Sequence, residues 1–526
     1  MFDIVIKNAE IIDGTGRKKY KSDLAVSEGK IKKIGNLGEA RAKKYIYAGN
    51  LYLVPGFIDI NNHSDTYLTI FTIPSLESML RQGITTIIGG NCGSSLAPLI
   101  SLDGFKSIQK WADLKEINLN WLTFREFLEE LGKRKIGVNF GSLVGHSTLR
   151  RGLIKDEFRI LTDRELTTVK QIFKSALKEG AFGLSTGLAY SHARIAPTKE
   201  LIELAKIVKD FDGVYATHIR GEAEELLPAI EETIQIGKKT NVSIEISHLK
   251  AMGRNNWQNM KHALDLIQRA RLSGINLSFD IYPYTVSGSV LYILLPDWVA
   301  EGGREEMLKR LKNKKTKNRI IKEMQEKKYY DYDKIIIAIS PIDQTFIGKK
   351  MTDIAATQNI SVEEAIINLL TASSGRIITF FDTLNEENLE MGISHSSSLV
   401  STDGYGCDIN HYKIKKELVH PRCFGAIPRF LEIYTKKKKL LSWEEAIRKI
   451  SGGPAQKIGI KDRGIIKKNN RADLVLLNPK RISDKSSFDN PYQYPEGIEC
   501  VVLNGEIVIE NGIYNGKKAG MILKKS

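Results

Sequence analysis

The chain has few cysteines and no long apolar run, and these scarcities exclude two broad classes of protein. Its four cysteines are scattered over 526 residues, unlike the dense spacing of a small disulfide-stapled secreted domain. No stretch reaches the roughly 18 apolar residues that a membrane-spanning helix needs. The start, MFDIVIKN, also lacks the basic and then apolar pattern of an export signal, so we expect a cytoplasmic protein with no membrane partner.

Acidic residues are outnumbered, because 62 Asp and Glu stand against 78 Lys and Arg and leave a formal charge of +16. Such an excess can indicate a nucleic-acid partner. However, the lysine clusters at 312–319 and 436–439 contain no aromatic residues, which favours a solvated surface, and we expect no nucleic-acid partner. Apolar residues at 42 % and charged residues at 27 % are ordinary globular values and exclude a largely disordered chain.

The pattern of apolar residues predicts an α/β protein with β-rich ends. Residues 1–55 and 460–526 alternate apolar and polar positions, so we expect both termini to form one small β-sandwich, with a hairpin turning at Asn504 and Gly505. Residues 56–459 alternate strand-like and helix-like stretches with eight strands, which predicts a (β/α)8 TIM-like barrel. The stretch at 287–350 is too long for a simple crossover and is expected to form an inserted subdomain.

Five of the predicted barrel strands end in a potential metal ligand: His63, Cys92, His218, His248 and Asp403. Taken singly, each histidine is more often structural, a buried cysteine is common, and Asp before Gly is a turn signal. Their recurrence favours a site, because a parallel barrel gathers the strand ends at one mouth. One thiolate and two imidazoles would hold zinc with a fourth position open, as in catalytic sites, and Asp403 would be the general base and then the general acid.

The motifs that carry these residues resemble the D-aminoacylase (N-acyl-D-amino-acid deacylase) family of the amidohydrolase superfamily. In chain order they are VPGFIDINNHSD, GGNCG, LVGHSTLR, GLSTGL, THIRGE, SHLK, DIYPYT, STDG, HPRCFGAIPR and RADLVLLNP. The resemblance implies zinc-dependent hydrolysis of an N-acyl-D-amino acid to a carboxylate and a free D-amino acid. It also implies that Cys92, His218 and His248 hold the firm zinc and that Asp403 activates water.

One position departs from the family pattern, which carries a His-x-His pair where this chain has Asn61, Asn62 and His63. An amide oxygen is a weak, neutral zinc ligand, so we expect one firmly bound Zn²⁺ and a weakened second site near His63. The resemblance assigns the substrate's carboxylate to four further residues: Lys250, Arg422, Tyr282 and Ser289. Arginine and lysine suit a carboxylate, because they offer paired donors and a point charge.

Two other functions stay open at this point. A cyclic amidase of the dihydroorotase or hydantoinase type would share the barrel and the ion, although GLSTGL offers no lysine to bridge two metals. An inactive scaffold protein is the other, and Asn61 is the argument for it. His146 matches a family motif and is expected to be structural. Five histidines are expected only to pack or to face solvent: His192, His262, His395, His411 and His420. The preferred side chain, the acyl group and the number of subunits are left open.

Overall fold

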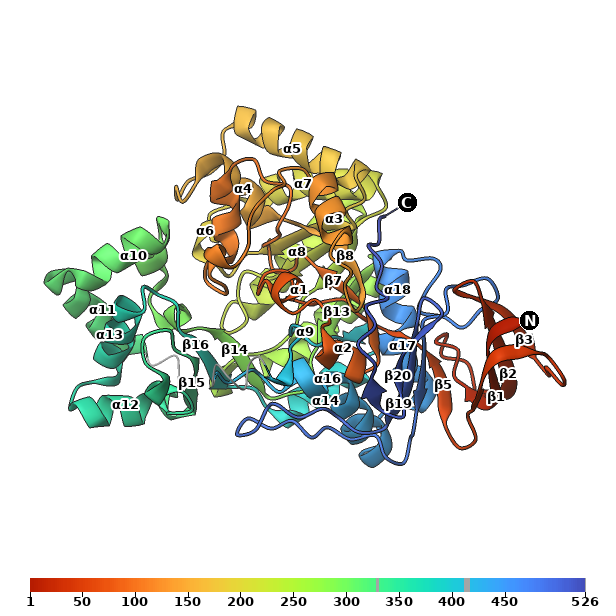
Figure 1. Ribbon diagram of the computed structural model, residues 1–526. Helices are drawn as coiled ribbons and strands as arrows, with labels where there is room; N and C mark the ends of the chain where they lie inside the picture. The colour runs from red at the N-terminus through yellow and green to blue at the C-terminus, as the bar shows by residue number, and fades with distance from the viewer. Residues whose placement is uncertain (328–330, 411–416, 526) are drawn as a thin grey trace.

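The computed structural model describes residues 1–327, 331–410 and 417–525; His411 lies outside this part of the chain. Figure 1 shows a central barrel with the sheet of the two termini on one side and an inserted subdomain on the other. Within the described ranges, no helix is long and apolar enough to cross a lipid bilayer.

Both termini contribute to one nine-stranded sheet, which confirms the pairing expected from the sequence. Its strands are β1 (Phe2–Ile11), β2 (Tyr20–Ser27), β3 (Lys30–Gly35), β4 (Ala42–Tyr47), β5 (Tyr52–Pro55), β18 (Leu474–Leu477), β19 (Ile498–Leu503), β20 (Glu506–Glu510) and β21 (Ile513–Tyr514). The two ends of the chain meet where β5 pairs antiparallel with β18. The predicted hairpin joins β19 to β20, and Asn504 and Gly505 both have positive φ, as a type I′ turn requires.

Eight parallel strands form the barrel, as the sequence predicts. They are β6 (Phe57–Asp59), β7 (Ile84–Gly89), β8 (Asn139–Ser142) with its continuation β9 (Val144–Gly145), β10 (Gly183–Gly187), β11 (Val214–His218), β12 (Ser243–Ile246), β13 (Leu277–Ile281) and β17 (Ser398–Val400). The first and last strands meet at a parallel bridge between Asn62 and Gly404, which closes the ring. Helices such as α5 (Asp163–Lys178), α7 (Thr198–Asp210), α8 (Leu226–Thr240) and α9 (Asn259–Leu272) lie outside it (Figure 1). Strands covered in this way are buried on both faces, which explains their uninterrupted apolar runs.

The inserted subdomain has its own sheet and its own core. Its three antiparallel strands are β14 (Val286–Val290), β15 (Ile335–Ile339) and β16 (Ile378–Asp382). They pack with α10 (Gly303–Lys312), α11 (Lys314–Lys327), α12 (Met351–Gln358) and α13 (Val362–Ala372) around apolar residues between Leu291 and Phe381. The inserted subdomain therefore extends past residue 350, beyond the bounds of 287–350 expected from the sequence. The reason is that α13 and β16 complete this sheet and its core instead of adding a unit to the barrel.

Candidate metal centre and active site

The ends of five barrel strands converge on one pocket. His63 follows β6, Cys92 follows β7, His218 ends β11, His248 follows β12 and Asp403 follows β17. All five side chains line this pocket. The four residues expected to bind the substrate's carboxylate line it as well: Lys250, Tyr282, Ser289 and Arg422. The structure therefore brings every residue of the predicted site together.

Cys92, His218 and His248 form a compact group of potential metal ligands. Their ligand atoms all lie within 4.8 Å of one another, and the Cys92 Sγ is 3.4 Å from the Nε2 of His248. The rings of His218 and His248 meet edge to face with centroids 4.4 Å apart. A thiolate and two imidazoles at this spacing match the donor set of a catalytic zinc site.

Two features show that these residues fit a cation. Both ring nitrogens of His218 are buried without a hydrogen-bond partner in the described protein, although buried polar atoms are rarely left unpaired. Burial raises the pKa of the Cys92 thiol, but the neighbouring histidines, His248 first, outweigh this effect and hold the pKa well below its usual value. A thiolate beside an unpaired imidazole is an arrangement that a divalent metal would satisfy.

Three of the site residues have a left-handed backbone conformation. The φ angles are 51° at Cys92, 39° at His248 and 47° at Asp403, and none of these residues is glycine. Such conformations cost on the order of 1–3 kcal/mol each and are concentrated at functional sites. Each turn redirects the chain directly after a strand, so that the side chain lies over the barrel mouth.

Glu222 is a site residue that the sequence reasoning did not assign. Its carboxylate lies 3.1 Å from the Nδ1 of His248 and 3.6 Å from the Nε2 of His218, and it forms an ion pair with Lys250. Burial raises the pKa of Glu222, but Lys250 and His218 lower it below its usual range, so the group is a carboxylate. A carboxylate on the Nδ1 of His248 leaves the Nε2 facing Cys92. The available signal was its position in THIRGE, four residues after His218.

Asp403 is held from two sides. Its Oδ1 is 3.0 Å from the Nε2 of His63, and its Oδ2 is 2.6 Å from a guanidinium nitrogen of Arg422. Burial raises the pKa of Asp403, but Arg422, His248 and His63 together keep it well below its usual value. His63, Cys92 and Asp403 also form a second group of potential ligands, which shares Cys92 with the first.

Asn61 occupies the position at which the chain departs from the family pattern. Its amide nitrogen donates to Asp280 at 3.2 Å, and its buried Oδ1 has no hydrogen-bond partner among the described residues. Asp280 also accepts from the hydroxyl of Ser401 at 2.6 Å. The Asn61 side chain thus serves a buried polar network between strand ends.

Several aromatic residues also line the pocket, and no sequence motif indicated them. Tyr67, Trp111 and Tyr190 line it, and Tyr190 lies against His218 with ring centroids 5.2 Å apart. His146 lies away from the pocket, where its Nε2 is 2.8 Å from Glu200 in a buried cluster with Arg150. This contact agrees with the structural role expected for His146.

Comparison with known proteins gives relatives that match along the whole chain. A model of the amidohydrolase family matches residues 419–509. A D-aminoacylase from Alcaligenes xylosoxydans xylosoxydans is 30 % identical over 100 % of this chain and 98 % of its own. An N-acyl-D-aspartate deacylase from the same organism is 32 % identical over 99 % of this chain and 95 % of its own.

Solved structures agree with these relatives. An N-acyl-D-glutamate deacylase from Bordetella bronchiseptica, in complex with zinc and a phosphonate mimic of the tetrahedral intermediate, has a TM-score of 0.84 and 28 % identity, with 99 % of both chains covered. A second solved structure is a D-aminoacylase with a binuclear metal centre, in which one metal activates the enzyme and a second attenuates it. It also has a TM-score of 0.84 and 28 % identity, with 100 % of both chains covered. Because similarity to such relatives extends from end to end and the fold is shared, this chain belongs to the D-aminoacylase (N-acyl-D-amino-acid deacylase) family of the amidohydrolase superfamily.

Proposed function

We propose that this chain is a zinc-dependent deacylase that hydrolyses N-acyl-D-amino acids to a carboxylate and a free D-amino acid. The observation that supports this best is the position of Asp403 beside a Cys, His, His ligand group, in a pocket that also holds Arg422. In this proposal Cys92, His218 and His248 hold one zinc ion. Bound there, zinc would act as a Lewis acid towards the amide carbonyl and lower the pKa of water.

Asp403 is the proposed general base and then the general acid. Its carboxylate takes a proton from the attacking water and afterwards delivers that proton to the leaving amine nitrogen. His63 contacts the Oδ1 and fixes the orientation of the carboxylate towards the ligand group. The left-handed backbone at Asp403 serves the same purpose, since it aims the side chain across the barrel mouth.

The proposed carboxylate site consists of Arg422, Tyr282, Ser289 and Lys250. The hydroxyl of Tyr282 is buried without a hydrogen-bond partner in the described protein, so a ligand oxygen would satisfy it. Arg422 lies over the Tyr282 ring, 4.8 Å from its centroid, and contacts Asp403. Binding of a substrate carboxylate to Arg422 would therefore compete with this contact and release one oxygen of Asp403. Lys250 is paired with Glu222 and lines the same pocket.

Hydrolysis assays with paired enantiomers test this proposal. We expect zinc-loaded protein to cleave N-acetyl-D-amino acids at least about 100-fold faster than the L-enantiomers, since the fixed carboxylate site and the metal together define one hand. Opening of a hydantoin ring without cleavage of the linear amides would favour a cyclic amidase instead. Absence of all hydrolysis in zinc-loaded protein would favour an inactive scaffold. The strand β10, GLSTG, contains no lysine to bridge two metals, which supports the deacylase.

A further inference from the structure

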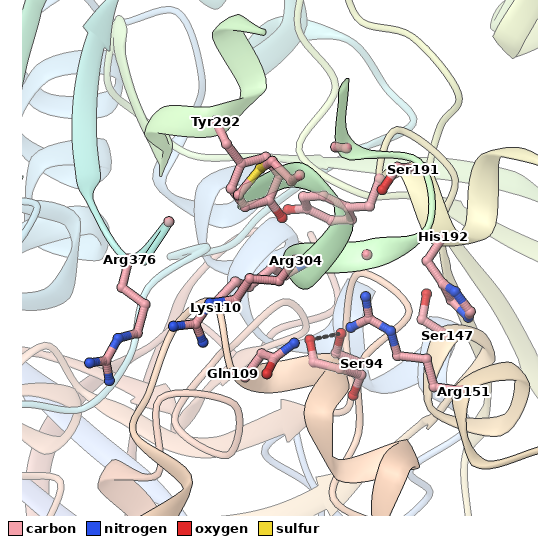
Figure 2. Close-up of a pocket in the computed structure, with 16 residues that line it drawn as sticks. Ser94, Gln109, Lys110, Ser147, Arg151, Ser191, His192, Tyr292, Arg304 and Arg376 are labelled. Atoms are coloured by element: carbon pink, nitrogen blue, oxygen red, sulfur yellow. Dashed lines mark hydrogen bonds between the residues drawn. The ribbon is translucent and has the colours of Figure 1, made fainter. Parts of the chain in front are cut away.

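A second pocket lies next to the active-site pocket, and positive charge dominates its lining. Lys110, Arg151, Arg304 and Arg376 line it, together with hydroxyl groups such as that of Ser94 (Figure 2). No Asp or Glu occurs among the described residues of this lining. Four cationic groups around one cavity without a lining carboxylate form a site suited to an anion.

The positive charges of two of these residues, Lys110 and Arg304, are not fully compensated by nearby carboxylates. No carboxylate contacts Lys110 in the described ranges; instead its ammonium lies over the Tyr190 ring, 3.1 Å from the centroid. Burial lowers the pKa of Lys110 well below its usual range, and Arg151 lowers it further. The pKa of Arg304 is lowered as well, by burial and then by Arg376. An anion in the pocket would relieve this repulsion. By contrast, Arg151 and Arg376 already contact Asp156 and Asp113, at 2.9 Å and 3.3 Å.

His192 gives an independent indication of a ligand. The residue is only 7 % exposed, it lines the same pocket, and its Nε2 has no hydrogen-bond partner in the described protein. A buried histidine nitrogen without a protein partner at a cavity wall can donate to a ligand oxygen when the ring carries its proton on that nitrogen. From the sequence, His192 is expected only to pack or to face solvent, whereas the structure places it in the lining of this second pocket.

The second pocket shares a wall with the active site. Tyr190 lines both cavities, and its ring lies next to both His218 and Lys110. Neighbouring residues also divide between the two, since Lys110 faces the second pocket and Trp111 the first. The inserted subdomain completes the second pocket through Arg304, near the start of α10, where the helix dipole adds to the positive field.

We propose that this second pocket binds an anionic oxygen group, a carboxylate or a phosphate-like anion, beside the catalytic centre. This inference rests on the proposed function. It says that the substrate carries a second carboxylate besides its α-carboxylate, either on the D-amino-acid side chain or at the end of the acyl group. A free inorganic anion is the other source of the same chemistry.

Matched substrate pairs identify the source of the anion. One pair is N-acetyl-D-glutamate and N-acetyl-D-glutamine, and the other is N-succinyl-D-methionine and N-butanoyl-D-methionine. We expect wild type to favour the acidic member of one pair by at least about tenfold in kcat/KM, the size typical of a charge-assisted contact. The substitutions Arg304→Gln and Lys110→Gln should remove most of that preference. Lys309→Gln, an exposed charge of the same helix α10, is the matched control and should keep it.

Calorimetric titration with inorganic phosphate tests whether the pocket binds a free inorganic anion instead. If neither pair shows a preference but wild type and Lys309→Gln bind phosphate and the two pocket variants do not, the anion site stands and its ligand is a free anion. If no pair shows a preference and wild type binds no phosphate, the proposal is overturned. Phosphate binding without cleavage of any substrate would refute the deacylase function and leave the pocket assignment intact.

Discussion

At the scale of single residues, the proposed chemistry depends most on Asp403. We predict that Asp403→Asn lowers kcat for an N-acetyl-D-amino acid by at least about 100-fold, because an amide cannot carry the proton from water to the amine. The zinc content, measured by mass spectrometry of the same sample, should stay unchanged, since the proposed zinc ligands are Cys92, His218 and His248. A variant with wild-type turnover would remove Asp403 from the mechanism.

Asn61 is expected to set the number of metal ions. We predict one zinc per chain in protein purified without added zinc, because an amide in the place of a histidine weakens the second ligand group of His63, Cys92 and Asp403. Asn61→His should add a second equivalent, since imidazole is a much better zinc ligand. Asn61→Ala is the control and should keep one. Two zinc ions in the unaltered protein would contradict the prediction.

At the scale of elements, Asp59 connects the first barrel strand to the last. One of its oxygens accepts from the backbone N–H of Thr402 at 2.9 Å, and the other accepts from the Thr402 hydroxyl and from Asn62. Burial raises the pKa of Asp59 to about 6, although these hydrogen bonds lower it. The folded protein therefore holds this proton more tightly than the unfolded chain.

A pH-dependent stability follows from this shift. The contribution of protonated Asp59 is complete below the unfolded pKa of 3.8 and is lost as pH rises through about 6. We predict that Asp59→Asn destabilises the protein most at acidic pH. The difference in the free energy of unfolding between wild type and the variant should shrink by about 2 kcal/mol between pH 4 and pH 7, since one pKa unit corresponds to about 1.4 kcal/mol and pH 4 lies close to the unfolded pKa. Denaturant unfolding at both pH values measures it, with the exposed Asp210→Asn as control. A gap independent of pH would contradict the assignment.

At the scale of the whole molecule, metal binding and folding should be coupled. The proposed zinc ligands, Cys92, His218 and His248, follow or end three different strands, so only the closed barrel brings them together. We predict that removal of zinc with a chelator lowers the midpoint of thermal unfolding, because zinc at about 1,000 times its Kd stabilises the folded state by about 4 kcal/mol. In calorimetry, Cys92→Ser should show little response to the chelator. A wild-type midpoint that chelation does not change would refute the coupling.

Much of the architecture was predictable, because the relevant signals are local. Uninterrupted apolar runs marked the eight barrel strands, and Asn504 and Gly505 marked a hairpin turn. The end of the insertion was not predictable, because a strand such as β16 reads alike whether it joins the barrel or a separate sheet. Only its antiparallel pairing with β14 and β15 distinguishes the two cases.

The sequence by itself determined which donor atoms are available and that they follow strands of one parallel barrel, because ligand type and strand periodicity are properties of short segments. Only the tertiary structure decided the contacts that depend on the path of the backbone after each strand. These are the Arg422 contact with Asp403, the Glu222 link to His248, and the cationic pocket behind Tyr190. Lys110 and Arg304 are far apart in the chain, and no local pattern relates them. They share a cavity because the inserted subdomain packs against the barrel mouth, and the positive charges gathered in this cavity favour an anion.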